Sequence, residues 1–152
     1  EGLSGNLSAT WLDATYTEFV TGDYRQNFEQ VDLSGNYLQN APKYTLNGVL
    51  DYRRPVTATG AFVGRMEASY QDTVYFTEFN NSDAEQEAYG LLNLMAGYEG
   101  GDGKWSVTGW VRNATDEFVY SNNIITAPLY GSVRVGSLLP PRTYGLTLAL
   151  NF

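Results

Sequence analysis

The chain has 152 residues, a formal net charge of −8 at neutral pH, and neither cysteine nor histidine. Without cysteine it has no disulfide scaffold or thiolate metal site, and without histidine it cannot be a Ser-His-Asp hydrolase or a zinc enzyme with imidazole ligands. The acidic balance disfavours a nucleic-acid partner, which needs clustered lysine and arginine to neutralise phosphates. We therefore expect no enzyme, no metal site and no resident cofactor.

The first three regular segments alternate between apolar and polar residues, which is the period of a β-strand with two different environments. Leucine, methionine, glycine and alanine fill the apolar positions, and an aromatic residue stands at one or both ends of each apolar row. We predict a strand in each segment. They cover residues 3–11, 43–53 and 62–71.

The next three segments repeat the pattern, with Leu91, Met95 and Trp110 as apolar exceptions on the otherwise polar side. They cover residues 91–99, 105–112 and 142–152. The last segment alternates up to its final aromatic residue, whereas a soluble domain usually ends in frayed polar residues. An amphipathic last strand with a terminal aromatic residue indicates an outer-membrane β-barrel.

Aromatic residues stand at the ends of the apolar rows, where headgroups meet hydrocarbon in a membrane barrel, whereas a soluble sandwich would place them mid-strand. Charged strand residues fall on the polar side, because a basic residue facing the bilayer midplane costs roughly 2–4 kcal/mol. The pattern thus predicts transmembrane strands. We expect lipid to contact Leu3, Leu7, Trp11, Tyr44, Leu46, Leu50, Tyr52, Phe62, Met66, Tyr70, Leu92, Leu94, Tyr98, Trp105, Val107 and Val111.

The links between these strands alternate between short and long. Residues 53–59 and 99–104 form short links, and the long links lie near residues 19–42, 77–88 and 116–141. Bacterial barrels have tight periplasmic turns and longer outer loops. We therefore expect the two short links to lie in the periplasm and the three long links to lie outside the cell.

Six strands are too few to close a single-chain membrane barrel, for which eight is the usual minimum. Residues 24–34 and 129–135 are the only candidates for further strands, and neither alternates over a membrane length. The chain also has no starting methionine and no leader-like segment, so we expect either that a signal peptide was removed or, as the favoured interpretation, that the chain begins in the middle of a longer protein. We predict an all-β antiparallel up-and-down meander of about six strands that forms the C-terminal portion of a larger transmembrane β-barrel.

Four segments resemble the last strands of TonB-dependent outer-membrane receptors: residues 40–47, 89–94, 105–120 and 141–152. The resemblance implies a barrel of about 22 strands filled by an N-terminal plug. It also implies a short box ahead of the plug that recruits TonB, and active import of a scarce nutrient. On this resemblance, residues 1–152 are a C-terminal barrel fragment with no plug domain and no TonB box.

Three groups of residues and one tryptophan are considered for specific roles. Tyr144, Leu146, Leu148, Leu150 and Phe152 resemble the signal that the barrel-assembly machinery reads by edge pairing, although Phe152 also fits a plain interfacial ring. Tyr130 and Arg134 are loop candidates for contact with an anionic ligand. Asp116 and Glu117 are interpreted as structural, because two adjacent carboxylates without a third ligand are ordinary. Trp110 is expected to face the lumen and pack against a plug.

The resemblance thus predicts an outer-membrane receptor for a ferric siderophore, with a glycan or cobalamin as alternative cargo. A passive porin or a small structural barrel is the alternative from another functional class. The expected partners are the lipid bilayer, lipopolysaccharide, the barrel-assembly machinery and, only through the plug, TonB.

Overall fold

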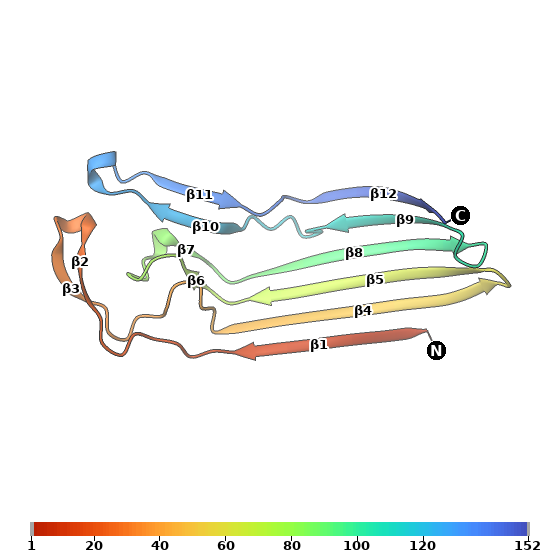
Figure 1. Cartoon of the computed structure of the whole chain (residues 1–152), viewed down its shortest axis with the longest axis horizontal. Coiled ribbons are helices and arrows are strands. Elements are labelled where there is room, and N and C mark those ends of the chain that lie inside the picture. Colours follow the sequence, from red (N-terminus) through yellow and green to blue (C-terminus); the bar gives the residue numbers. More distant parts are fainter. Residues whose placement is uncertain (1, 152) are drawn as a thin grey trace.

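A computed structural model of the chain describes residues 2–151, in which six long antiparallel strands form one continuous sheet (Figure 1). The long strands lie side by side in chain order, which makes an up-and-down meander. They are β1 (Leu3–Trp11), β4 (Tyr44–Thr57), β5 (Gly60–Gln71), β8 (Tyr89–Gly100), β9 (Trp105–Arg112) and β12 (Thr143–Leu150). The predicted all-β meander of about six strands is confirmed.

The pairing register keeps the apolar rows of all six strands on one face of the sheet. Leu50 of β4 pairs with Met66 of β5, and Met66 pairs with Leu94 of β8. Leu94 pairs with Val111 of β9, Val111 pairs with Tyr144 of β12, and β1 joins this row beside Leu50. Since side chains alternate with a period of two, this row fixes the face of the other strand residues. One face is therefore apolar, and the opposite face carries the polar and charged groups.

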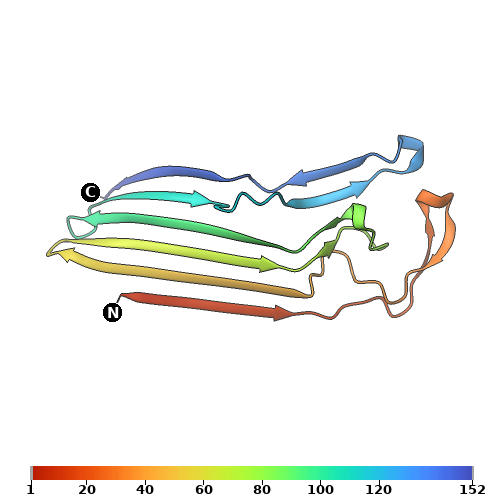
Figure 2. The ribbon, with the colours of Figure 1, turned by 180° about the vertical axis from the view of Figure 1, so that it is seen from behind.

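Short elements gather beyond one end of the sheet, whereas the tight turns and both ends of the described chain lie at the other end (Figure 1, Figure 2). No helix within residues 2–151 is long and apolar enough to cross a membrane. The ribbons are β2 (Val20–Asp23) with β3 (Glu29–Asp32), β6 (Val74–Tyr75) with β7 (Glu85–Gln86), and β10 (Tyr120–Ile125) with β11 (Arg134–Leu138). The 3-10 helices are η1 (Tyr24–Gln26), η2 (Ser82–Ala84) and η3 (Pro128–Tyr130).

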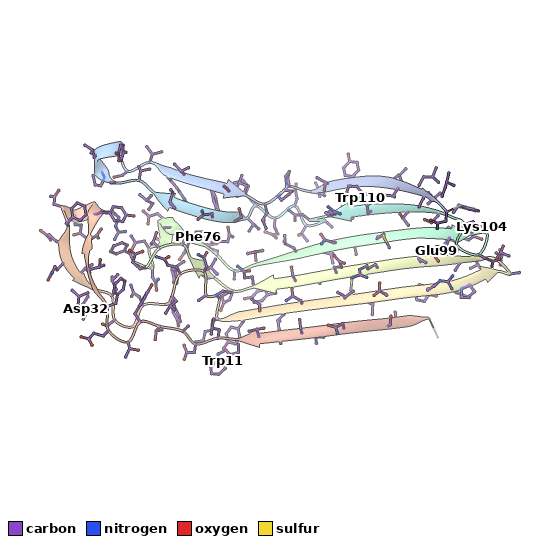
Figure 3. The ribbon with its side chains drawn as sticks, in the orientation of Figure 1. Trp11, Asp32, Phe76, Glu99, Lys104 and Trp110 are labelled. Carbon is purple, nitrogen blue, oxygen red and sulfur yellow. The ribbon has the colours of Figure 1, made fainter. Side chains whose placement is uncertain are left out.

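Buried side chains lie mainly in the connections and not in the sheet. Val74, Phe76, Phe79 and Val119 are each no more than 8% exposed, whereas Leu7 in the middle of β1 is 80% exposed. Figure 3 shows Phe76 among the connections, far from Glu99 at the turn end of the sheet. A large contiguous apolar face left open in this way marks a membrane or partner surface.

The predicted short link at residues 53–59 is too long, because β4 continues as a strand to Thr57. Pro55 stands opposite Ala61, and the register shifts between Pro55 and Thr57. Proline has no N–H to donate and is tolerated in a strand at such an irregularity. The presence of Pro55 therefore did not end the strand.

The second predicted short link, residues 99–104, also begins later than expected, because β8 extends to Gly100. The chain turns through Gly101, Asp102 and Gly103, which all have positive φ angles between 56° and 85°. Glycine adopts this backbone region without steric cost, and aspartate tolerates it better than most residues. The turn is accordingly tighter than the sequence suggested.

Residues 24–34 and 129–135, the candidates for further membrane strands, do not join the six-stranded sheet. They contribute β3 and the start of β11, which belong to separate two-stranded ribbons in the long connections. These ribbons were not predicted, because the sequence indicates only long, polar links there. Their strands have only two to six residues each, too few for a clear alternation.

Candidate functional surfaces of the sheet and its connections

The apolar face carries aromatic rings near both ends of the strands. At the loop end Trp11 pairs with Tyr44. At the turn end the ring centroids of Phe62 and Tyr98, and those of Tyr98 and Trp105, are each 5.6 Å apart. Two levels of rings with aliphatic residues between them are typical of the interfacial girdles of a membrane barrel. The register places all sixteen residues that we expected to face lipid on this face.

The apolar face continues along β12, the last strand of the sheet. Tyr144, Leu146, Leu148 and Leu150 are between 57% and 82% exposed there. Phe152, the remaining member of the predicted assembly signal, lies outside the described residues. An outer strand offers backbone N–H and C=O groups for pairing with another strand, which is the chemistry that the assembly signal would use. The signal role stays a prediction.

Charged groups on the polar face bond to one another within β5 and across to its neighbouring strands. Arg65 donates from Nε to Glu67 at 2.7 Å and from Nη1 to Asp51 at 3.2 Å. Asn93 donates to the second carboxylate oxygen of Glu67 at 3.4 Å, which extends the network to β8. Exposed pairs of this kind are screened by solvent and contribute little to stability. They therefore give the face its polarity and add little stability.

Trp110, the aromatic exception on the polar face, lies against β12 (Figure 3). Its Nε1 donates to Thr147 Oγ1 at 3.3 Å, and the guanidinium carbon of Arg112 lies 5.3 Å from its ring centroid. A Cβ atom at Gly145 would lie 2.5 Å from Trp110 Cζ2, so the ring sits directly over this glycine. Trp110 therefore faces the polar side as predicted. Arg65, Glu67, Asn93, Trp110, Arg112 and Thr147 line a hollow of about 360 Å³ beside it.

Gly145→Ala should displace the Trp110 ring, because the added methyl overlaps the indole. Overpacking of this kind costs about 1–3 kcal/mol. We expect a lower free energy of unfolding for the intact protein and a changed Trp110 fluorescence. Gly109→Ala is the control, since its Cβ would come no closer than 3.5 Å to Leu146 Cδ2. Equal free energies of unfolding for the two variants would contradict close packing of the Trp110 ring on Gly145.

A buried ion pair organises the first long connection, residues 12–43. Asp23 is 2% exposed and accepts hydrogen bonds from Arg25 Nη2 at 2.7 Å and Nε at 2.8 Å. Gln26 Nε2 donates to the same carboxylate at 3.0 Å. The hydrogen bonds from Arg25 outweigh the effect of burial and lower the pKa of Asp23 to about 2. Asp23 is therefore ionised throughout the physiological range.

The same cluster joins the three long connections. The Arg25 guanidinium carbon lies 4.2 Å from the ring centroid of Phe79, which belongs to the second connection, residues 72–88. Tyr24 packs edge-on against Phe79 at 5.8 Å, and its hydroxyl donates to the carbonyl oxygen of Ile125 in the third connection at 3.3 Å. Burial raises the pKa of Tyr24, so this hydroxyl keeps its proton. The connections thus form one packed unit.

Acid should loosen the first connection through Asp23. Its folded pKa of about 2 lies below the ordinary value of 3.8, so protons bind more readily to the unfolded form. The resulting stabilisation, about 2 kcal/mol, is present above the ordinary pKa and is lost as pH falls through about 2. Hydrogen exchange in residues 20–32, corrected for intrinsic rates, should show less protection at pH 2.5 than at pH 6. Asp23→Asn should be weakly protected at both pH values; equal protection of the unmodified protein at both would contradict this role.

Asn113 closes the base of the third connection, residues 113–142. Its φ angle is 48° and it is 6% exposed. The side chain accepts from the N–H of Glu117 at 2.9 Å and donates to the carbonyl oxygens of Glu117 at 2.9 Å and Pro140 at 3.4 Å. The backbone N–H of Asn113 donates to Asn93 Oδ1 on β8 at 3.0 Å. One asparagine therefore ties both ends of the connection to the sheet.

Asp116 also joins the start of the third connection to its end. Its carboxylate accepts from the backbone N–H of Arg142 at 3.0 Å and from the Arg142 guanidinium at 3.3 Å. The backbone N–H of Glu117 is held by Asn113. Both residues thus take part in joining the start of the connection to its end, in line with their structural interpretation.

The predicted ligand contacts Tyr130 and Arg134 both lie on the third connection. Tyr130 ends η3 and is 72% exposed. Arg134 begins β11, and its guanidinium carbon lies 4.7 Å from the ring centroid of Tyr120. The described contacts thus hold Arg134 against Tyr120, and a joint site with Tyr130 stays a prediction.

Acidic residues concentrate in the connections. The three long connections contain twelve acidic and four basic residues, so they carry a net charge of −8, which equals the charge of the whole chain. The rest of the sequence has five acidic and five basic residues and no net charge. The loop end of the sheet is therefore an acidic surface, which repels anions at long range.

The sequence model described as "TonB dependent receptor-like, beta-barrel" matches residues 1–114 of this chain. The chain belongs to the TonB-dependent receptor β-barrel family. Members of this family are outer-membrane transport receptors and not enzymes. The family assignment therefore replaces the passive porin alternative.

The fold also resembles part of a solved receptor structure. The ferric yersiniabactin uptake receptor FyuA from Yersinia pestis superimposes with a TM-score of 0.74 at 17% sequence identity. The match covers 99% of this chain and 21% of that receptor, so the chain spans about a fifth of that length. At this identity the likeness establishes the fold alone. The six strands therefore form part of the wall of a TonB-dependent receptor barrel.

The partly and fully buried polar residues that organise the connections of this chain could not be identified from the sequence. Asn80, for example, has a φ angle of 50°, accepts from the N–H of Tyr37 at 2.6 Å and donates to the Tyr37 carbonyl oxygen at 3.0 Å. Asparagine is enriched in left-handed conformations and bonds to nearby backbone. The available signal was the set of Asn and Asp residues within the long connections, which identified turns but no partners.

Proposed function

We propose that the apolar face of this receptor sheet contacts membrane hydrocarbon and that its polar face lines the barrel lumen. The observation that carries this proposal is the register, which separates the aliphatic rows from the Arg65 network over all six strands. The long acidic connections then face the outside, and the two tight turns face the periplasm.

Spin labels on adjacent residues test this assignment. Leu46 lies on the apolar face and Asn47 on the polar face of the same strand. In the full-length receptor with a single introduced cysteine, a label at Leu46→Cys should collide more often with oxygen, which dissolves in hydrocarbon. A label at Asn47→Cys should collide more often with a water-soluble nickel chelate. Equal or reversed accessibilities would overturn the assignment.

We further propose that the receptor containing this chain imports a ferric siderophore by TonB-energised transport. Family membership supports energised uptake, and the FyuA likeness supports an iron chelate as cargo. The plug and the TonB-contacting box belong, in this proposal, to a part of the receptor that precedes residues 1–152. Lipopolysaccharide around the outer girdle and the assembly machinery at the β12 edge are the further partners that it implies.

Uptake measurements test the cargo. A strain without the gene should fail to accumulate radiolabelled iron from the cognate ferric siderophore, and the full-length gene should restore accumulation. Panels of ferric siderophores, cobalamin and glycans should be compared in the same strains. A defect confined to cobalamin or to growth on a glycan would overturn the siderophore proposal while leaving the barrel assignment intact.

Deletion of Phe152 should lower the amount of full-length receptor in the outer membrane, if the C-terminal row of β12 is the assembly signal. The physical reason is that the last strand and its terminal aromatic residue are read by edge pairing. Quantitative immunoblots of outer-membrane fractions measure the effect, with Phe152→Tyr as the conservative control. Unchanged assembly of the deletion variant would contradict the signal role.

A further inference from the structure

One charged side chain interrupts the apolar face of the sheet. Arg54 of β4 pairs in register with Phe62 of β5, so it shares a face with Tyr52 and Leu50. The other charged residues of the six described strands lie on the polar face. Its position next to Phe62 therefore needs a physical explanation.

Arg54 and its neighbour Arg53 have different surroundings. Arg53 is on the polar face and donates from Nε to Glu99 at 3.2 Å. Within residues 2–151, no carboxylate forms an ion pair with Arg54. Among the described residues, therefore, no carboxylate neutralises the Arg54 guanidinium, which lies on the side where we propose that lipid lies.

The position of Arg54 along β4 matches the edge of the hydrocarbon. It stands ten residues after Tyr44, whose ring belongs to the loop-end girdle. A strand rises about 3.3 Å per residue, which gives roughly 33 Å along the strand. At a tilt of about 40° this corresponds to a height of about 25 Å, the height of the apolar band of such barrels. Arg54 therefore lies at the level of the head groups on the turn side.

The side chains around Arg54 favour a lipid over a free anion. Phe62 and Tyr52 beside it are 54% and 41% exposed, so the positive charge stands at the end of an apolar surface that acyl chains can cover. An arginine keeps its aliphatic stem on apolar surface and its charged end in the polar layer. Its planar guanidinium also binds phosphate oxygens in a bidentate manner.

We propose that Arg54 binds the phosphate of a phospholipid head group at the turn end of the barrel. The inference depends on the proposed contact between the apolar face and lipid. It adds a specific polar site to a surface otherwise covered by non-specific acyl chains, and it fixes the depth of β4 in the membrane.

Photo-crosslinking tests this site in the full-length receptor, held in phosphate-free dodecyl maltoside micelles. The probe is a phosphatidylglycerol with a diazirine on its head group, and chymotryptic peptides locate the adducts. We expect adducts on the segment around Arg54, reduced about fivefold by Arg54→Gln, because one basic residue at a membrane surface contributes roughly that factor in affinity. Arg53→Gln is the matched control, with the same charge change on the other face, and should leave the yield unchanged.

Competition distinguishes the chemistry that Arg54 recognises. Excess unlabelled phosphatidylglycerol should suppress the adduct, whereas diacylglycerol of the same chains and inorganic phosphate should not. An unchanged yield in Arg54→Gln, equal loss in both variants, or competition by diacylglycerol or by inorganic phosphate would each overturn the proposal. The spin labels at positions 46 and 47 test the membrane face separately. If they report lipid and water as expected while the crosslinking fails, the phosphate site is wrong and the proposed membrane face is still supported.

Discussion

Leu50→Arg is expected to destabilise the full-length receptor by about 2–4 kcal/mol, the cost measured for basic residues facing the middle of a bilayer in membrane barrels. Leu50 lies six residues after Tyr44 and four before Arg54, so it stands near mid-height on the apolar face. An arginine stem there is too short to carry the charge to either head-group layer without distortion.

Val49→Arg is the matched control, because it places the same side chain one residue away on the polar face. Val49 stands opposite Glu67 in the register, so a new guanidinium there meets a carboxylate. We expect a change of no more than about 1 kcal/mol. Urea titrations of receptor folded into lipid vesicles compare the two variants. A similar decrease in the free energy of unfolding for both variants would show that lipid does not contact the Leu50 face.

The strands could be predicted because a membrane barrel imposes two environments on every strand. Leu50 belongs to the apolar row and Asp51 to the polar row of the same strand, so the sequence of the segment itself alternates between the two. The bounds were less accurate where turn chemistry decides them. Pro55 lies inside β4 and did not end it, since the register shift after it removes the need for its missing N–H.

The fold of the connections could not be predicted in the same way, because it depends on contacts between segments far apart in the chain. Arg25 meets Phe79, and Tyr24 meets the carbonyl oxygen of Ile125, 101 residues away. The alternation of apolar and polar residues in the sequence does not show which distant residues contact one another. The sequence showed acidic residues and turn formers there, whereas the structure shows Asp23 buried and fully bonded.

Asn113→Ala is the second variant with a large expected effect, and it acts on the third connection. The substitution leaves the N–H of Glu117 and the carbonyl oxygens of Glu117 and Pro140 without their side-chain partner, which costs about 1–3 kcal/mol. Alanine also tolerates the φ angle of 48° poorly, which adds about 1 kcal/mol. We expect a local loss of about 2–4 kcal/mol, seen as faster hydrogen exchange in β10 and β11.

Asn113→Gly separates the two causes, because glycine adopts the same backbone angle freely but lacks the amide. It should lose the side-chain hydrogen bonds and be less damaging than alanine by about 1 kcal/mol. In both variants the backbone N–H still donates to Asn93, so exchange in β8 should change little. Protection of β10 and β11 that is unaltered in both variants would mean that packing around Val119, and not the Asn113 closure, holds the connection on the sheet.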